Sequence, residues 1–303
     1  MAERKFSSKR YINLTIPRER CRHLPCDLCG VDKTRHITEA NGFDLVRCRN
    51  CGFVYVDPRP TREALRDFYE EYFVEGEENI SAWRREFQSL YREIRERINR
   101  SYGKKGKILD VGCSFGFFLD VMKEDGWDIY GLDYSRIAVD YAVDTMGFPH
   151  VLRGGIEDGL FADETFDVVT SFYVLEHVLE PTDMLQYVFR VLKKGGLAVN
   201  RVPFTRPLIP FFRLLGLPVF EAPMHLNDFS PRTMPLFLEK AGFKDIHITA
   251  TRSRRAEEKG TRLAMGATAA AGRLVSWLSR GRLFFPLTGA FLSLARKPEK
   301  GGK

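Results

Sequence analysis

Residues 108–133 contain a pattern of glycines, hydroxyls and acids that could hold a nucleoside. From 108 to 116 the chain reads Ile-Leu-Asp-Val-Gly-Cys-Ser-Phe-Gly, an apolar strand that enters a tight turn of small residues. Such a turn lets the backbone approach a ligand closely, and the N-terminus of the following helix offers unpaired N–H groups. Asp133 closes the next predicted strand, 23 positions after Asp110, where a carboxylate can accept hydrogen bonds from ribose hydroxyls. This layout predicts an adenosine-containing ligand.

The turn departs from the fingerprint of dinucleotide-binding proteins. A G-x-G-x-x-G pattern would need glycine at 114 and 117, where this chain has Ser114 and Phe117. A phenyl ring at 117 crowds the place where a pyrophosphate would lie. The expected ligand therefore has one ribose, no phosphates and an amino-acid tail, and S-adenosylmethionine has that shape.

Five short motifs, taken in order, resemble those of the class I S-adenosylmethionine-dependent methyltransferases. They are Asp110-Val-Gly-Cys-Ser-Phe-Gly116, Gly131-Leu-Asp133, Thr165-Phe-Asp-Val-Val169, Leu175-Glu-His-Val178 and Leu192-Lys-Lys-Gly-Gly196. The resemblance covers residues 105 to 297 and implies an α/β fold, with a doubly wound, Rossmann-like, seven-stranded sheet. It also implies the cofactor-binding residues Asp110, Gly112, Ser114, Gly116, Asp133, Tyr134, Ile156, Glu157 and Tyr173.

The segment Gly154-Gly-Ile-Glu-Asp158 aligns with the adenine contact of this family. Many members place an aspartate one residue after the glycine, where it accepts from the adenine amino group. Gly155 occupies that position here. The contact could come instead from the Ile156 backbone and from the side chain of Glu157 or Asp158.

Two histidines are candidates for the chemistry or for substrate contact. Methyl transfer is accelerated mostly by holding the nucleophile in line with the methyl group, but a hydroxyl nucleophile also benefits from a base such as histidine. His177 follows the carboxyl end of a predicted strand at 166–172, and His225 lies in the loop before a predicted helix at 231–241. Either histidine could instead only orient the backbone of its loop.

A catalytic metal is not expected beside His177. Members of the family that methylate quinone precursors hold a divalent metal with a Glu-x-x-Glu-His motif. This chain reads Tyr173-Val-Leu-Glu-His177, so one ligand is replaced. The sequence therefore argues against a metal at this position.

Four cysteines near the N-terminus have the spacing of a structural zinc ribbon: Cys26, Cys29, Cys48 and Cys51. The two residues between the cysteines of each pair allow a tight turn that aims both thiolates at one ion. Four thiolates close the coordination sphere, so the predicted zinc is structural and not catalytic. The alternative is a pair of disulfides or four unconnected core cysteines, which this spacing makes unexpected in a reducing compartment. Cys21 and His23 lie nearby but off the pattern.

The chain divides into three predicted parts: a zinc-ribbon module at 1–60, a helical linker or cover at 61–104, and a methyltransferase domain at 105–303. Apolar insertions interrupt the last part near 204–220 and 261–287, and charged residues break both too often for a membrane span. They could simply pack, cover a hydrophobic substrate, or lie at a membrane surface.

Composition is that of a soluble enzyme. At 303 residues and 44% apolar content the chain can fill a large core. The N-terminus has no apolar signal-peptide core, and six cysteines do not suggest a secreted disulfide scaffold. We expect a cytoplasmic protein, with peripheral contact at the inner membrane surface as an option. A net charge of +7 permits acidic partners without choosing among them.

Three functions follow from these observations. The first is O-methylation of a small molecule, a sugar or a lipid-linked glycan intermediate. The second is RNA methylation, with the ribbon binding RNA. Four basic residues permit it, although no interleaved aromatic residues accompany them: Lys33, Arg35, Arg47 and Arg49. The third is a scaffold that binds S-adenosylmethionine without turnover, and the intact Asp110 and Asp133 argue against loss of the cofactor.

Overall fold

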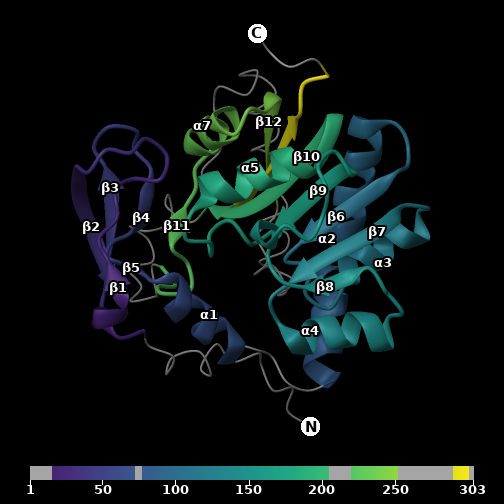
Figure 1. The fold of residues 1–303 in the computed structure, drawn as a ribbon, viewed down its shortest axis with the longest axis horizontal. Coiled ribbons are helices and arrows are strands. Elements are labelled where there is room, and N and C mark those ends of the chain that lie inside the picture. The colour runs from purple at the N-terminus through teal and green to yellow at the C-terminus, as the bar shows by residue number, and fades with distance from the viewer. Residues whose placement is uncertain (1–15, 72–76, 205–219, 252–288, 300–303) are drawn as a thin grey trace, which may run out of the picture.

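The computed structural model describes residues 16–71, 77–204, 220–251 and 289–299, and its centre is one sheet of seven strands. The strand order is β12-β13-β10-β9-β6-β7-β8, and only β13 runs antiparallel to its neighbours (Figure 1). The predicted doubly wound, Rossmann-like sheet is confirmed. Its strands are β6 (Lys107–Val111), β7 (Asp128–Asp133), β8 (Val151–Arg153), β9 (Phe166–Phe172), β10 (Leu192–Phe204), β12 (Lys244–Thr251) and β13 (Gly289–Arg296).

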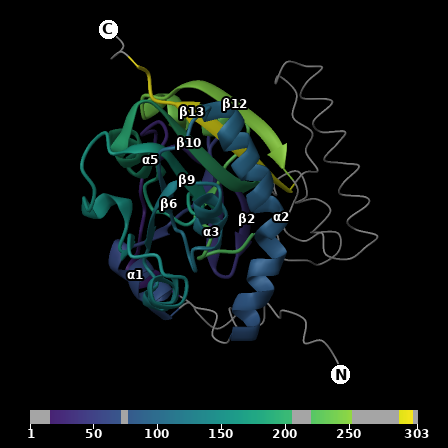
Figure 2. The same cartoon turned by 90° about the vertical axis from the view of Figure 1, so that its right-hand side faces the viewer.

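Helices cover both faces of this sheet, and each face has its own apolar core. Strand β9 is buried almost throughout because Val168 packs into one core and Val169 into the other. The first core lies beneath α2 (Glu77–Tyr102) and α3 (Phe117–Glu124). The second lies beneath α5 (Pro181–Val191) and α7 (Thr233–Lys240), and Figure 2 shows α2 and α5 on opposite sides of the molecule.

Short helices connect the remaining strands. Helix α4 (Arg136–Asp140) starts at Ser135, whose hydroxyl accepts the Ala138 N–H at 3.3 Å, as expected of an N-cap serine. It continues as a π-helical turn at Tyr141–Thr145. A 3₁₀ turn at Ile156–Asp158 follows β8.

Strand β10 contains the whole motif Leu192-Lys-Lys-Gly-Gly196 and already pairs with β9 at Leu192. Two backbone hydrogen bonds of 2.9 Å join Gly195 and Gly196 to Lys297, just past the end of β13, and hold the segment in place. The pairing with β9 shifts register between Leu192 and Leu197, and Gly195 supplies a φ of 74° there.

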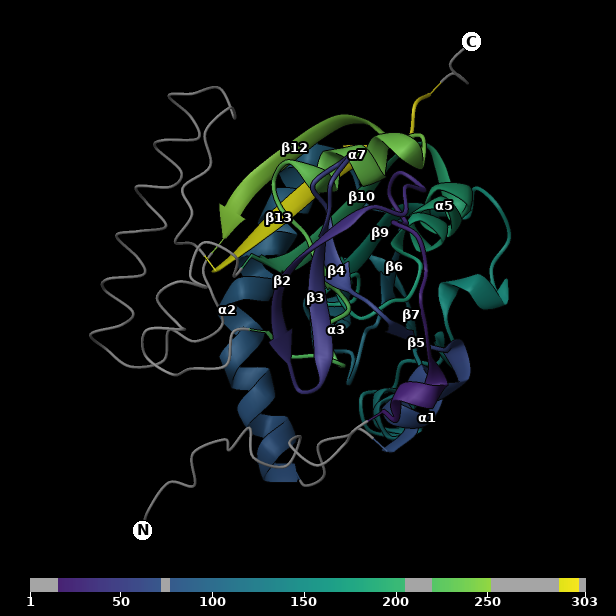
Figure 3. The same cartoon turned by 90° about the vertical axis from the view of Figure 1, so that its left-hand side faces the viewer.

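The N-terminal part forms a second sheet that stands to one side of the first (Figures 1 and 3). Its strand order is β11-β4-β3-β2, and the edge strand β11 comes from a loop of the C-terminal part. A separate pair, β1 with β5, lies beside it. These strands are β1 (Cys21–Arg22), β2 (Thr34–Ala40), β3 (Phe43–Cys48), β4 (Val54–Val56), β5 (Arg59–Pro60) and β11 (Asn227–Asp228).

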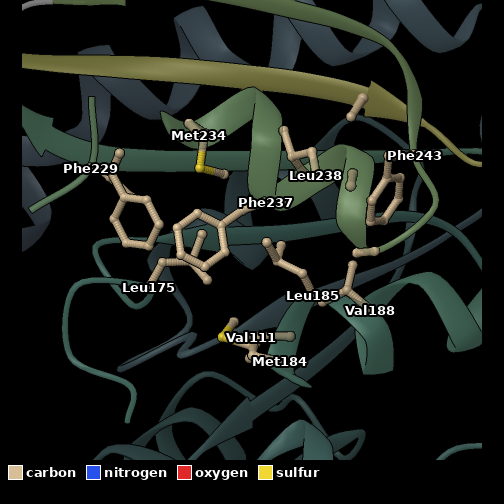
Figure 4. Packing of buried hydrophobic residues seen from close by; sticks show 14 of the residues in the cluster. Val111, Leu175, Met184, Leu185, Val188, Phe229, Met234, Phe237, Leu238 and Phe243 are labelled. Carbon is tan, nitrogen blue, oxygen red and sulfur yellow. The ribbon is translucent and has the colours of Figure 1, made fainter. Parts of the chain in front are cut away.

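The N-terminal sheet and the central sheet share one apolar core. The Phe53 ring, after β3, lies 4.7 Å from the Phe237 ring of α7 and 5.4 Å from the Phe229 ring, measured between centroids. Figure 4 shows Phe237 directed from α7 toward Phe229 and Leu175. The two sheets are therefore packed together through shared aromatic side chains, across the predicted boundary at residue 60.

Two helices join the two sheets: α1 (Arg62–Glu71) and the long α2, whose Ile94 and Ile98 are buried against the central sheet. The predicted apolar insertions near 204–220 and 261–287 lie almost wholly outside the described residues. Among the helices that the structure describes, none combines the length and apolar character needed to cross a bilayer.

Phe237→Ala should destabilise the protein strongly, because it removes a fully buried ring from the core that joins the two sheets. The free energy of unfolding in urea should fall by about 3–5 kcal/mol. Leu236→Ala is the matched control, since the neighbouring Leu236 is 42% exposed and its loss should cost much less. Equal losses from the two substitutions would contradict the shared core.

Candidate active site

The carboxyl ends of β6 and β7 bring the glycine-rich turn and Asp133 together. Asp133 accepts the backbone N–H of Ser114 at 2.8 Å on one carboxylate oxygen and that of Ser135 at 2.9 Å on the other. Burial raises the pKa of Asp133, although both backbone hydrogen bonds act to lower it. Each oxygen keeps a second lone pair, so the anchored carboxylate can still accept from the hydroxyls of a ligand.

The turn between β6 and α3 has polar groups that the described residues leave unused. The buried Ser114 hydroxyl oxygen has no hydrogen-bond partner among them, and Ser114 itself has a left-handed φ of 50°. Gly116 occupies the N-cap position of α3 with a φ of 78°, and no side chain in the described part of the chain accepts a hydrogen bond from the first turn of this helix. A buried hydroxyl and an uncapped helix start are groups that a polar ligand could satisfy, so the turn fits the cofactor that the sequence implies.

Gly112 brings this turn against the loop that follows β9. A Cβ at Gly112 would overlap the Val174 side chain, and its φ of 73° also favours glycine. The neighbouring Asp110 is buried in the sheet and accepts a 2.5 Å hydrogen bond from the Thr170 hydroxyl. Burial raises the pKa of Asp110 to about 7. Asp110 therefore ties β6 to β9 at the base of the turn.

Tyr134 and Glu157 lie together where the sequence predicts the contact with the adenine ring, a place called the adenine edge below. The Tyr134 hydroxyl donates to the Glu157 carboxylate, and a Cβ at Gly155 would overlap both side chains. An aspartate at this position, as in many family members, would require the Tyr134 and Glu157 side chains to move. Ile156 is buried beside them, and Arg62 of α1 reaches the Glu157 carboxylate at 3.9 Å.

Tyr173 lies where β9 leaves the sheet, in a left-handed conformation with a φ of 59°. Its backbone N–H donates to the Arg201 carbonyl at 2.8 Å, and the Arg201 guanidinium lies 4.5 Å from its ring centroid. Phe87 of α2 contacts the same ring edge-on, with 6.5 Å between centroids. Arg201 is fully buried, and the sequence analysis did not select it.

The structure brings His177 and His225 together, although the sequence placed them in separate loops. Their ring centroids are 4.8 Å apart and the rings are inclined by 67°. Burial lowers the pKa of His177 to about 3 and that of His225 to about 4, so both rings are neutral at pH 7. Nδ1 of His177 lies 2.8 Å from the Met224 carbonyl oxygen. A carbonyl only accepts, so this nitrogen carries the proton and Nε2 carries the lone pair.

Glu176 is a third member of this group that the sequence analysis did not select. Its side chain is fully buried, and neither carboxylate oxygen has a hydrogen-bond partner among the described residues. Oε1 lies 3.9 Å from Nε2 of His177. Burial raises the pKa of Glu176 to about 8. The sequence signal that could have identified Glu176 is its place next to a histidine, just after a buried strand.

The four predicted zinc ligands lie together, with all sulfurs within 4.8 Å of one another. The Cys26 and Cys51 sulfurs are 3.5 Å apart, and those of Cys29 and Cys48 are 3.6 Å apart. These separations are too long for disulfides and close to the roughly 3.8 Å between sulfurs of a tetrahedral zinc site. The off-pattern His23 instead contacts the carboxylates of Asp32 and Asp57, at 2.8 and 2.7 Å.

Comparison with known proteins agrees with this arrangement. The profile of a methyltransferase domain family matches residues 83–248, more than half of the chain. A probable S-adenosylmethionine-dependent methyltransferase of Mycolicibacterium smegmatis is 26% identical over 177 residues, which cover 56% of this chain and 61% of that protein. A ubiquinone biosynthesis O-methyltransferase of Photobacterium profundum is 29% identical over 159 residues, which cover 49% and 67%.

A solved structure shares the fold at low identity. Phosphoethanolamine N-methyltransferase 2 of Haemonchus contortus, in complex with phosphomonomethylethanolamine and S-adenosylhomocysteine, superposes with a TM-score of 0.51 and 17% identity. The superposition covers 81% of this chain and 62% of that one. The chain therefore belongs to the methyltransferase domain family and has the fold of the class I S-adenosylmethionine-dependent methyltransferases.

Proposed function

We propose that this protein transfers the methyl group of S-adenosylmethionine to a hydroxyl oxygen of a small molecule, a sugar or a lipid-linked glycan intermediate. The single observation that carries the proposal is the neutral pair of His177 and His225, because His177 lies on the loop whose Val174 packs against Gly112 of the glycine-rich turn. The names of several relatives, which are ubiquinone biosynthesis O-methyltransferases, support oxygen as the acceptor atom.

The residues of this chain bind the cofactor, orient the acceptor and help to remove the proton of its hydroxyl group. Asp133 accepts hydrogen bonds from the ribose hydroxyls. The turn around Gly112 lets the protein backbone approach the cofactor closely, and Tyr134 and Glu157 contact the adenine ring. When bound, S-adenosylmethionine supplies an electrophilic methyl carbon on sulfur. The acceptor oxygen bonds to that carbon while the carbon–sulfur bond breaks and its electron pair stays on sulfur. The lone pairs of the two imidazoles assist removal of the hydroxyl proton.

The N-terminal module holds a structural zinc ion in this proposal, and the ion serves the active site indirectly. Strand β11 begins two residues after His225 and pairs with β4 of the module, where the Val56 N–H also donates to the Leu226 carbonyl at 2.9 Å. A zinc ion on the cysteine cluster would rigidify the turns beside β3 and thereby the loop that carries His225. These contacts favour a positioning role for the module over a grip on RNA.

Asp133→Ala should weaken S-adenosylmethionine binding by about 10- to 100-fold, because it removes an anchored acceptor and leaves the Ser114 N–H without its partner. Calorimetry with S-adenosylmethionine and S-adenosylhomocysteine measures the loss. Asp128→Ala, at the opposite end of β7, is the control and should bind as the wild type does. Unchanged affinity in Asp133→Ala would remove the cofactor assignment.

His177→Ala and His225→Ala should each lower methyl transfer by about 10²- to 10⁴-fold while the affinity for S-adenosylmethionine stays nearly constant. Transfer is measured with labelled S-adenosylmethionine on a panel of hydroxyl acceptors that includes nucleotide sugars and lipid-linked glycans. His247→Ala, on the exposed face of β12, should retain full activity. Full activity in both active-site variants would contradict their role.

Cys48→Ser should release one zinc ion per chain and lower the thermal unfolding temperature, because the buried Cys48 is one of four clustered thiols. Metal analysis of the purified protein and thermal unfolding are the measurements. Cys21→Ser is the matched control, since Cys21 is outside the cluster and should leave zinc content unchanged. A wild-type protein purified without zinc would count against the ribbon.

A further inference from the structure

Four exposed basic side chains gather at one end of the hairpin that β2 and β3 form, and we call them the basic patch: Lys33, Arg35, Arg47 and Arg49. Arg35 and Arg47 are paired directly across the two strands, so their side chains lie on the same face. Lys33 and Arg49 lie one residue beyond the strand ends, and alternation places them on that face too. Cys48, between the last two arginines, points the other way and is buried. The hairpin lies on the side of the molecule that faces the viewer in Figure 3.

The basic patch has no ion pair with a carboxylate within the parts of the chain that the structure describes. Other arginines of the N-terminal module do have such partners. Arg18 pairs with Asp44 at 3.3 Å, and Arg20 pairs with Asp67 of α1 at 2.6 Å. Like charges directly opposite each other destabilise a strand pair, so the two facing arginines of the patch weaken the hairpin that carries them. An anionic partner would remove that repulsion.

The basic patch offers charge without apolar or aromatic contacts. The N-terminal module contributes none of the exposed large apolar side chains of the described residues, which are Tyr134, Ile137, Leu152, Leu160 and Leu236. Proteins that bind single-stranded nucleic acid stack its bases on aromatic side chains in addition to contacting phosphates. A patch of charge alone suits the phosphates of an anionic bilayer, where each lysine or arginine raises the association constant by about five-fold.

We infer that the basic patch docks the protein on an anionic phospholipid surface. The choice of this partner rests on the proposed function, whose acceptors include lipid-linked glycan intermediates. The same hairpin reaches the active site, because Asn41 in its turn donates to the Ala222 carbonyl at 2.7 Å, three residues before His225. An extended strand from Arg35 to Asn41 spans about 20 Å. The active-site loop therefore lies within reach of a glycan chain carried by a lipid in the surface to which the patch binds.

Sedimentation with vesicles tests the docking without any need for methyl transfer. The wild type should bind vesicles of phosphatidylcholine mixed with phosphatidylglycerol, bind vesicles of phosphatidylcholine alone far more weakly, and dissociate at high salt. Arg35→Ala combined with Arg47→Ala should lower the affinity for the mixed vesicles about 25-fold, because each arginine contributes about five-fold. Arg35→Lys combined with Arg47→Lys keeps both charges and should bind as the wild type does.

Arg85→Ala combined with Arg92→Ala is the matched control, because it removes two exposed positive charges from α2 and leaves the basic patch intact. Equal losses from the two alanine pairs would show an effect of net charge only and would overturn the proposal. Equal binding of the wild type to both kinds of vesicle would overturn it too, as would a preference for single-stranded RNA over the mixed vesicles. Absence of methyl transfer to every acceptor would count against the proposed function and would leave the vesicle result standing.

Discussion

The arrangement of the site depends on one buried amide, that of Asn227. Its Nδ2 donates to the carbonyl oxygens of Leu175 and Val178, at 3.2 and 2.6 Å, on either side of His177. Its backbone pairs with Tyr55 in the N-terminal sheet. Asn227 thus fixes the loop after β9, the loop of His225 and the edge of the N-terminal sheet relative to one another. At 1% exposure, its hydrogen bonds have no ready replacement from water.

The parts of the site that sequence could predict are those encoded by adjacent residues. The glycine-rich turn, the acid that closes β7 and the two cysteine pairs each have a local signal in residue type and spacing. The order of the motifs was enough to predict the central sheet. The grouping of Glu176 and His177 with His225 has no such signal, because a two-residue strand and one amide bring the loops together. The burial that perturbs their pKa values arises from the same long-range packing.

The adenine edge shows how a departure from the family's pattern is accommodated. Gly155 leaves room that the Tyr134 hydroxyl and the Glu157 carboxylate occupy together. Arg62, at the start of α1, lies 2.5 Å from the Glu180 carboxylate as well as near Glu157. The helix that leaves the N-terminal module therefore reaches both the 3₁₀ turn after β8 and the start of α5. The N-terminal module is therefore linked to the predicted site at two separate places, through α1, which follows it in the chain, and through its pairing with β11.

The pairing of β4 with β11 also has a consequence during synthesis of the chain. Val54 pairs with Asp228, which the ribosome adds 174 residues later. Until then, one edge of β4 has no partner strand, and an open edge of this kind invites pairing with other chains. A tightly held ion in the cysteine turns would keep the early strands ordered during that interval. The N-terminal sheet thus starts with strands that are made early and is complete only after Asp228 has been added.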